Sequence, residues 1–222
     1  MVYVMENKHK TWYDYLTGEQ HQQLIDNSHL VHFNKGETII KQGIAADHIL
    51  FLEQGMVKLM IEDEKRSTAF KILSDHTFIG LMCAFVKRSF DFSAVAITPS
   101  QVRLINRSDF EEAIRSNGDF AVYITQQMSL MTNKVVHDLI RLSHKNADGA
   151  ISTVLIELSS VFNSHSFQMP FSRVELAHIV GYSKESVISC LSSLQRDGVI
   201  IASGKSIEIL DMKRLEIISR LG

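Results

Sequence analysis

The spacing of apolar and polar positions changes along the chain and divides the sequence into three regions, of which the first is β-rich, the second is one long helix and the third begins at residue 146. From residue 31 to residue 106, short runs of β-branched and aromatic residues recur between glycine-containing turns. Many short strands at this spacing are typical of a sandwich or barrel of the jelly-roll type. From residue 119 to residue 144, apolar residues recur every three or four positions with no glycine or proline between them. That period predicts one long helix.

The apolar positions of the long helix form a seam with steps of 4, 4, 3, 4, 4 and 3 residues. The seam consists of Phe120, Ile124, Met128, Met131, Val135, Leu139 and Leu142. A seam of this length predicts a coiled coil, and a single chain offers no second long helix to cover it. We therefore expect the same helix of a second copy to be the partner. The alternative is that the helix packs against its own β-rich region.

The region from residue 146 onward predicts a helix-turn-helix followed by a β-hairpin, the wing. Ser172 and Glu175 have the spacing of a capping box, in which each side chain bonds a free backbone N–H at the start of a helix. Gly181 stands where the two helices meet, because glycine adopts a sharp turn without steric cost. Two β-rich runs with Gly204 between them follow the second helix.

The second of these helices, 183–197, has an outward face of mostly short polar side chains. With its apolar positions turned inward, the residues left outside near its start are Lys184, Glu185, Ser186 and Ser189. An ordinary surface helix carries pairs of long Glu and Lys side chains. A helix that enters the major groove needs hydrogen-bonding groups that reach base edges. This face therefore indicates DNA recognition.

Two stretches of the chain resemble one protein family. The run VELAHIVGYSKESVISCLSSLQRDGVI, followed by GK.I, resembles the DNA-binding domain of the CRP/FNR superfamily of bacterial transcription regulators. The run FNKGETIIKQGIAADHILFLEQGMVKLMI resembles the start of the cyclic-nucleotide-binding-type β-roll of that superfamily. The resemblance implies an α+β fold in three parts. These are a β-roll sensor domain with flanking helices (1–118), a dimerisation helix (119–145) and a winged helix-turn-helix DNA-binding domain (146–222).

The resemblance also implies a homodimer that binds a palindromic promoter site through helix 183–197 and contacts RNA polymerase. Matched to the family motif, the residues expected at double-stranded DNA are Arg173, Ser183, Lys184, Glu185, Ser186, Ser189 and Lys205. Lys184 and Glu185 are expected at base edges. The residues better suited to phosphates are Arg173, Ser183, Ser186 and Lys205. Ser189 stands where relatives carry an arginine, so we expect the half-site to differ from the family's common types.

In the family that the chain resembles, nucleotide-binding members carry a phosphate cassette in the roll. It consists of a glycine, a glutamate for the ribose hydroxyl and an arginine for the cyclic phosphate. Here Gly80 is kept, but Leu81 replaces the glutamate and Phe92 replaces the arginine. A buried phosphate without a cation is very costly, so we do not expect cyclic AMP to bind unless Arg88 supplies the charge. The candidate effector pocket, Gly80, Leu81, Cys83, Phe92 and Ser93, favours either a small apolar effector or a filled core.

Composition and charge narrow the other possibilities. The chain is 45% hydrophobic and 22% charged, as expected of a soluble globular protein, and no apolar run is long enough to cross a membrane. We therefore expect a cytoplasmic protein. The net charge of −2 counts against nucleic-acid binding, but residues 172–206 carry four Lys and Arg against three Asp and Glu. A dimer doubles those local cations.

Other chemistries find little support in the sequence. Only Cys83 and Cys190 are present and they lie far apart, so neither a disulfide framework nor an iron–sulfur cluster is expected. No catalytic motif such as HExxH or a phosphate loop occurs, so we assign no catalytic residue and no metal site. Haem is an alternative, with His48, His76 or Cys83 as axial ligand. A further alternative is an effector-binding signalling module that acts through protein contacts rather than DNA.

Overall fold

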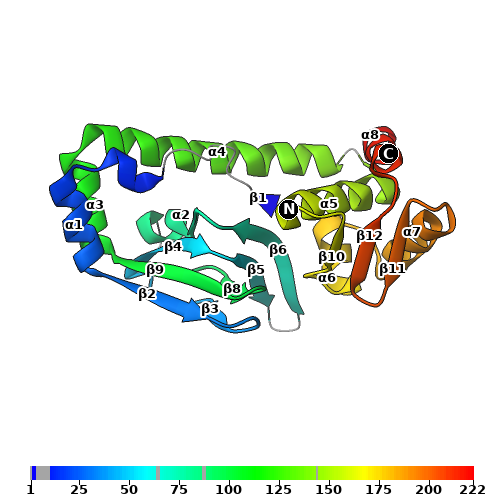
Figure 1. Ribbon diagram of the computed structural model, residues 1–222, viewed down its shortest axis with the longest axis horizontal. Coiled ribbons are helices and arrows are strands. Elements are labelled where there is room, and N and C mark those ends of the chain that lie inside the picture. The colour runs from blue at the N-terminus through cyan, green and yellow to red at the C-terminus, as the bar shows by residue number, and fades with distance from the viewer. Residues whose placement is uncertain (1, 4–10, 64–65, 87–88, 144) are drawn as a thin grey trace. The chain divides into compact units, whose positions relative to one another are not determined.

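The computed structural model describes residues 2–3, 11–63, 66–86, 89–143 and 145–222 (Figure 1). The chain divides into two units, which we call the β-roll unit (residues 4–62 and 73–136) and the helix-turn-helix unit (residues 1–3, 63–72 and 137–222). Helix α4 (Gly118–Ser143) and strand β6 (Arg66–Ser74) contribute residues to both units.

Antiparallel sheets form the β-roll unit. One sheet has the strand order β2 (Ser28–Phe33), β9 (Ser100–Asn106), β4 (His48–Gln54) and β7 (Thr77–Ile79). In the other sheet, β8 (Ser93–Ala96) pairs with both β3 (Thr38–Ile40) and β5 (Met56–Asp63). The β-rich texture of residues 31–106 is thus confirmed. Strand β2 is an edge strand in which no side chain is fully buried, so its sequence alternates too weakly to predict it on its own.

Short helices and an aromatic cluster belong to the same unit as the roll. The helices are η1 (Trp12–Tyr15), α1 (Gly18–Asp26), α2 (Leu81–Val86) and α3 (Arg107–Ser116). Trp12 is fully buried, and its ring centroid lies 5.9 Å from that of Phe51, 6.1 Å from that of Phe110 and 6.3 Å from that of Phe120. Because Phe120 belongs to the first turn of α4, this cluster fastens the start of α4 to its own roll.

The helix-turn-helix unit combines the end of α4 and four further helices with a small sheet. The elements are β1 (Val2–Tyr3), α5 (Ala147–Phe162), α6 (Arg173–Val180), α7 (Lys184–Arg196) and α8 (Met212–Leu221), with a sheet in the order β10 (Ser166–Gln168), β12 (Ser206–Ile209) and β11 (Ile200–Ser203). Strands β11 and β12 form the wing, in which Ser203 pairs with Ser206 around Gly204. The winged helix-turn-helix predicted from the sequence is therefore present.

Helix α5 begins at a well-defined cap. The Asn146 side chain accepts a hydrogen bond from the backbone N–H of Gly149 at 2.9 Å, and the backbone N–H of Asn146 donates to the carbonyl oxygen of Gly222 at 2.6 Å. Helix α8 also contacts α5 through the hydroxyls of Thr153 and Ser219, which lie 2.7 Å apart. These bonds hold the start of α5 against the end of α8.

Candidate nucleic-acid interface

Helix α6 begins at the capping box that the sequence predicts. The Ser172 hydroxyl accepts a hydrogen bond from the backbone N–H of Glu175 at 3.2 Å, and the Glu175 carboxylate accepts one from the backbone N–H of Ser172 at 2.7 Å. The helix ends at Gly181, whose φ of 76° lies in the left-handed region. These local interactions determine where α6 starts and where the chain turns toward α7.

Helix α7 separates a buried face from a polar face. Its first turn is capped by the Ser183 hydroxyl, which accepts a hydrogen bond from the backbone N–H of Ser186 at 3.1 Å. The inner face consists of Val187, Cys190, Leu191 and Leu194, which are at most 4% exposed. The opposite face exposes Lys184, Glu185 and Ser189, while Ser186 is half-buried beside the cap. The first turns of α7 therefore present the hydrogen-bonding groups that base edges require.

The wing is tied to the start of α6 by an arginine. The Arg173 guanidinium donates a hydrogen bond to the carbonyl oxygen of Gly204 at 3.0 Å. Burial lowers the pKa of Arg173 below its ordinary value, but arginine stays protonated in proteins, so the side chain remains a cation. Lys205, the next residue in the wing turn, is exposed. The structure thus brings together two cations that the sequence assigns to phosphates.

A groove of about 500 Å³ runs beside α7. Its lining includes Arg173, Ile188, Ser192, Gln195, Arg196 and Ala202. The Gln195 side chain accepts a hydrogen bond from the backbone N–H of Ala202 at 2.9 Å, which joins the helix to the wing. Ile188 is 46% exposed although it is apolar. The residues predicted from the sequence include neither Ile188 nor Gln195, yet the helical period that places Lys184 outside also places Ile188 outside one turn later.

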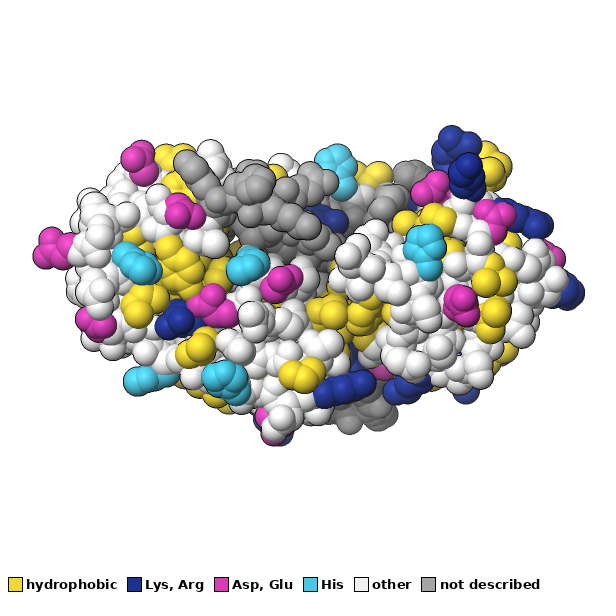
Figure 2. All heavy atoms as spheres, viewed as in Figure 1, with side chains coloured by type: hydrophobic (Ala, Val, Ile, Leu, Met, Phe, Trp, Pro, Cys, Tyr) yellow, Lys and Arg dark blue, Asp and Glu magenta, His cyan; other side chains and the backbone are white. Residues whose placement is uncertain are grey.

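The surface of this unit is not uniformly basic. Figure 2 shows that the visible side of the helix-turn-helix unit is mostly uncharged, with Lys and Arg side chains along its margins. This agrees with the small excess of cations in residues 172–206. On this visible side, positive charge is therefore local and does not form a broad basic field.

Cys190 is a core residue of α7. Burial raises the pKa of its thiol well above the ordinary value, and a hydrogen bond with the Asp148 side chain raises it further. The thiolate is the nucleophile and the metal ligand, so a thiol held in its protonated form is inert in both roles. The contact with Asp148 also links α7 to the first turn of α5.

In the β-roll unit, aromatic rings pack around Gly80 and the neighbouring cassette positions 81 and 92. Leu81 is 1% exposed and Phe92 is 8% exposed. A side-chain carbon added at Gly80 would lie 2.8 Å from the Phe90 ring and 2.9 Å from the Phe92 ring. The two rings therefore occupy the space beside Gly80. Neither a carboxylate nor a guanidinium extends from positions 81 and 92.

The cassette serine is bound to other side chains of the roll. Ser93 is 2% exposed, and its hydroxyl donates to the Glu62 carboxylate at 2.7 Å. The same hydroxyl accepts from the backbone N–H of Gln42 at 3.0 Å. Cys83, the remaining candidate of the pocket, is half-buried on α2. The hydroxyl of Ser93 thus donates its hydrogen bond to Glu62, a carboxylate of the same chain.

The residues considered for cofactors are scattered. His48 is half-buried on β4, His76 is exposed, and Arg88 lies outside the described residues. Across the described ranges, no group of three His, Cys, Asp or Glu side chains is placed to hold a metal ion. Within the same ranges, every helix is too short or too polar to cross a membrane.

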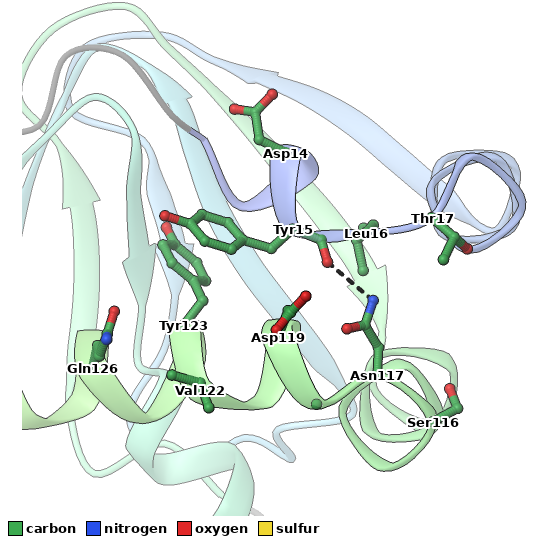
Figure 3. Close-up of a pocket in the computed structure, with 11 residues that line it drawn as sticks. Asp14, Tyr15, Leu16, Thr17, Ser116, Asn117, Asp119, Val122, Tyr123 and Gln126 are labelled. Atoms are coloured by element: carbon green, nitrogen blue, oxygen red, sulfur yellow. Dashed lines mark hydrogen bonds between the residues drawn. The ribbon is translucent and has the colours of Figure 1, made fainter.

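A cavity of about 880 Å³ lies elsewhere in the β-roll unit, at the start of α4 (Figure 3). Tyr15 and Tyr123 stack at its side with ring centroids 4.3 Å apart. The Asn117 amide donates to the carbonyl oxygen of Tyr15 at 3.0 Å. The charged residues that line the cavity are Asp14 and Asp119. Because both carry negative charge, this cavity disfavours a phosphate ligand.

Comparison with known proteins decides the family. Residues 30–117 match the cyclic nucleotide-binding domain family, and residues 135–218 match the Crp-like helix-turn-helix domain family. The transcriptional activator protein anr of Pseudomonas aeruginosa is 29% identical over 188 residues, which cover 80% of this chain and 75% of that protein. The cAMP-activated global transcriptional regulator CRP of Salmonella typhimurium is 25% identical over 191 residues, which cover 83% of this chain and 91% of that protein. The chain belongs to the CRP/FNR superfamily of transcription regulators.

Solved structures of the CRP/FNR superfamily share the fold. A protein of the family from Eubacterium rectale aligns with a TM-score of 0.78 at 23% identity, over 94% of this chain and 97% of that chain. FixK2 from Bradyrhizobium japonicum aligns with a TM-score of 0.71 at 21% identity, over 86% and 96%. The α+β architecture of β-roll, long helix and winged helix-turn-helix is therefore confirmed. Membership of the CRP/FNR superfamily also makes the chain a DNA-binding regulator and not an enzyme.

Helix α4 of this CRP/FNR chain directs part of its apolar seam into the chain itself. Phe120, Ile124 and Met131 are 0%, 4% and 9% exposed. Further along, Met128 is half-buried and Val135 is 38% exposed. The side chains of Leu139 and Leu142 lie outside the described residues. At the start of α4 the seam therefore fits the alternative of packing against the chain's own β-rich region.

Proposed function

We propose that this regulator is a homodimer that binds a palindromic promoter site through α7, with a β-roll that does not respond to cyclic nucleotides. The observation that carries the proposal is the division of α7, whose inward side chains are buried while Lys184, Glu185 and Ser189 are exposed. A helix held in this way can insert its N-terminal turns into a major groove. A cytoplasmic location and contact with RNA polymerase follow from the same assignment.

At the DNA, each exposed side chain has a role that suits its chemistry. Lys184 donates to an acceptor on guanine, and Glu185 accepts from the amino group of cytosine. Ser183, Ser186, Arg173 and Lys205 contact phosphates, which position the helix without reading sequence. The short Ser189 leaves the guanine contact of an arginine unmade, so the half-site differs from that of relatives with arginine at this position.

The dimer contact follows the exposed face of α4. Val122, Val136 and Ile140 are 57%, 48% and 53% exposed and lie on one face at helical spacing. On the same face the hydroxyls of Thr125 and Ser129 donate to the carbonyl oxygens four residues earlier, each at 2.8 Å, so they need no partner from another chain. A second copy can bury this face together with Met128 and Val135 of the predicted seam. Two α7 helices in such a dimer must lie about 34 Å apart to reach successive major grooves.

The roll has lost the means to hold a cyclic phosphate. The Phe90 and Phe92 rings fill the space at Gly80, and Glu62 takes the hydroxyl of Ser93. A small apolar effector, or a packing change with no ligand, therefore replaces the nucleotide as the signal. Such a signal shifts the population in which both α7 helices match their half-sites.

Selection from a random DNA pool with the full chain, followed by gel shifts, tests the assignment of α7. We expect a palindromic site and a loss of affinity of about tenfold for both Lys184→Ala and Glu185→Ala, since each removes a base contact. Lys213→Ala on α8 is the matched control, because it removes an exposed cation outside the proposed interface. If the chain selects no sequence, or if both α7 variants bind like wild type, the assignment fails and the protein-contact module becomes the better account.

Thermal unfolding with added ligand tests the roll. We expect no change in Tm with cyclic AMP or cyclic GMP at millimolar concentration, because binding to the native state alone would raise it. A clear stabilisation by either nucleotide would overturn the assignment of the closed cassette.

A further inference from the structure

One side chain on the DNA-facing side of α7 does not match its polar neighbours. Ile188 is 46% exposed and is the only large apolar residue of α7 that is exposed. Lys184 and Ser192, one turn before and one turn after it, are also exposed, so Ile188 lies in the middle of the outward face. The fold does not require an isoleucine here, because Val187, Cys190, Leu191 and Leu194 already fill the inner face.

The surroundings of Ile188 point to nucleic acid as the partner that covers it. Ile188 lines the groove beside α7, and Arg173 and Arg196 line the same groove. Two cations beside an apolar side chain suit a surface that combines phosphates with an apolar group. The core of a protein–protein interface is depleted of lysine and acidic side chains, whereas exposed Lys184 and Glu185 lie within one turn of Ile188.

In the major groove, one base presents an apolar group at its edge. The thymine C5-methyl group is the feature that apolar side chains contact there, whereas the other bases offer only hydrogen-bonding atoms. Lys184 and Ile188 are four residues apart, which is about 6 Å along a helix axis. That distance allows the two side chains to contact neighbouring positions of one half-site.

We propose that Ile188 is a specificity-determining residue that contacts the methyl group of a thymine in each half-site, close to the base pair that Lys184 contacts. This inference rests on the proposed insertion of α7 into the major groove. The contact removes both the methyl group and part of the exposed isoleucine from water, and it makes no hydrogen bond. Discrimination against other bases at that position therefore arises from apolar burial.

Replacing thymine by uracil tests the contact without altering the protein, because only the methyl group is removed. In the selected palindrome, each symmetric pair of thymines is replaced in turn and Kd is measured by fluorescence anisotropy. We expect one pair to weaken wild-type binding by about fifteenfold, from about fourfold for each of the two methyl groups lost. Replacement at the other positions should change Kd by less than about twofold.

Two variants complete the test. Ile188→Ala should bind the thymine and uracil sites equally, whereas Ile188→Val should retain most of the preference for thymine. Because Ile188 is exposed, urea unfolding should give nearly the same free energy for both variants and wild type. If wild type binds the selected site but tolerates uracil at every position, or if Ile188→Ala keeps the preference, the inference about Ile188 is wrong. If wild type selects no site, the proposed function fails instead.

Discussion

The start of α2 and the start of α7 use the same backbone device for opposite purposes. Each short helix follows a glycine with positive φ, 69° at Gly80 and 76° at Gly181. Beyond Gly80 the chain turns inward, where Leu81 is 1% exposed and the Phe90 and Phe92 rings press against the glycine. Beyond Gly181 the chain turns outward, and no atom lies within 4 Å of the place where a side chain would begin. Lys184 and Glu185 are exposed there.

The start of α2 and the start of α7 differ in what their side chains do: those at α2 pack into the roll, whereas those at α7 are exposed. At the cassette positions, Leu81 and Phe92 are buried and the Phe90 and Phe92 rings fill the space beside Gly80, so these side chains contribute to the packing of the roll. On α7 the polar groups remain exposed, where they add little to stability and are available to a partner.

Restoring the charged anchors should have the largest effect. In Leu81→Glu/Phe92→Arg, both side chains enter sites that are at most 8% exposed. We expect the free energy of unfolding, measured with urea, to fall by about 3 kcal/mol or more, because the charges are desolvated and the aromatic packing is lost. The apolar control Leu81→Met/Phe92→Leu should cost clearly less. Wild-type stability of the charged variant, together with binding of cyclic AMP, would mean that the cassette is still an open site.

Alanine at the two glycines gives a matched pair. Both substitutions place a side chain at positive φ, which costs about 1–2 kcal/mol. Gly80→Ala must also displace buried Phe90 and Phe92 rings, so we expect a total loss of about 2–4 kcal/mol there and only the backbone cost at Gly181. Chemical denaturation measures both values. Equal losses would show that the rings do not pack against Gly80.

Removing one hydroxyl tests how the turn after Gly181 is held. The Tyr182 hydroxyl donates to the carbonyl oxygen of Lys145 at 2.6 Å, directly before the cap of α5. We expect Tyr182→Phe to lower the free energy of unfolding by about 1 kcal/mol, because a partly buried carbonyl loses its donor. An unchanged unfolding curve for Tyr182→Phe would rule out a role for this bond in stability.

The smallest expected effect on stability comes from the cysteine thiols, and it appears only at alkaline pH. Cys83 on α2 is half-buried, whereas Cys190 on α7 is 3% exposed and has a raised pKa. A thiol reagent at pH 8 should therefore label Cys83 first and Cys190 only as the chain unfolds. The folded state binds the Cys190 proton more tightly than the unfolded state, because the pKa of the folded thiol is raised. The protonated thiol therefore contributes fully to the free energy of unfolding below the unfolded pKa of about 8.5, and this contribution is lost as pH rises above that value. Fast labelling of Cys190 in the native protein would contradict this.

Local sequence patterns were sufficient for the helix-turn-helix unit. The Ser172–Glu175 box, the Ser183 cap and the turn at Gly181 involve groups within three or four residues of one another, so their partners are fixed by the chain itself. The apolar period of α7 likewise determines which residues face inward. Ile188 is not among the residues predicted at the DNA, although its position in the helical period places it outside.

Long-range packing could not be obtained in the same way. The seam of α4 has the correct helical period. Such a period predicts that one face of the helix is buried, but it does not identify the residues that pack on that face. Phe120 packs with Phe110 and Trp12, which are 10 and 108 residues away in the chain. Similarly, the backbone N–H of Asn146 donates to the carbonyl oxygen of Gly222, which is 76 residues away in the chain.

The sequence by itself determined the order of the elements, the superfamily and the polar face of α7, because these depend on composition and on neighbours along the chain. Only the tertiary structure decided that the cassette is filled by two phenylalanine rings, that Glu62 binds Ser93, and that the first turns of α4 belong to their own roll. The reason is that these contacts join residues from separate segments, and their geometry exists only once the sheets and helices have packed.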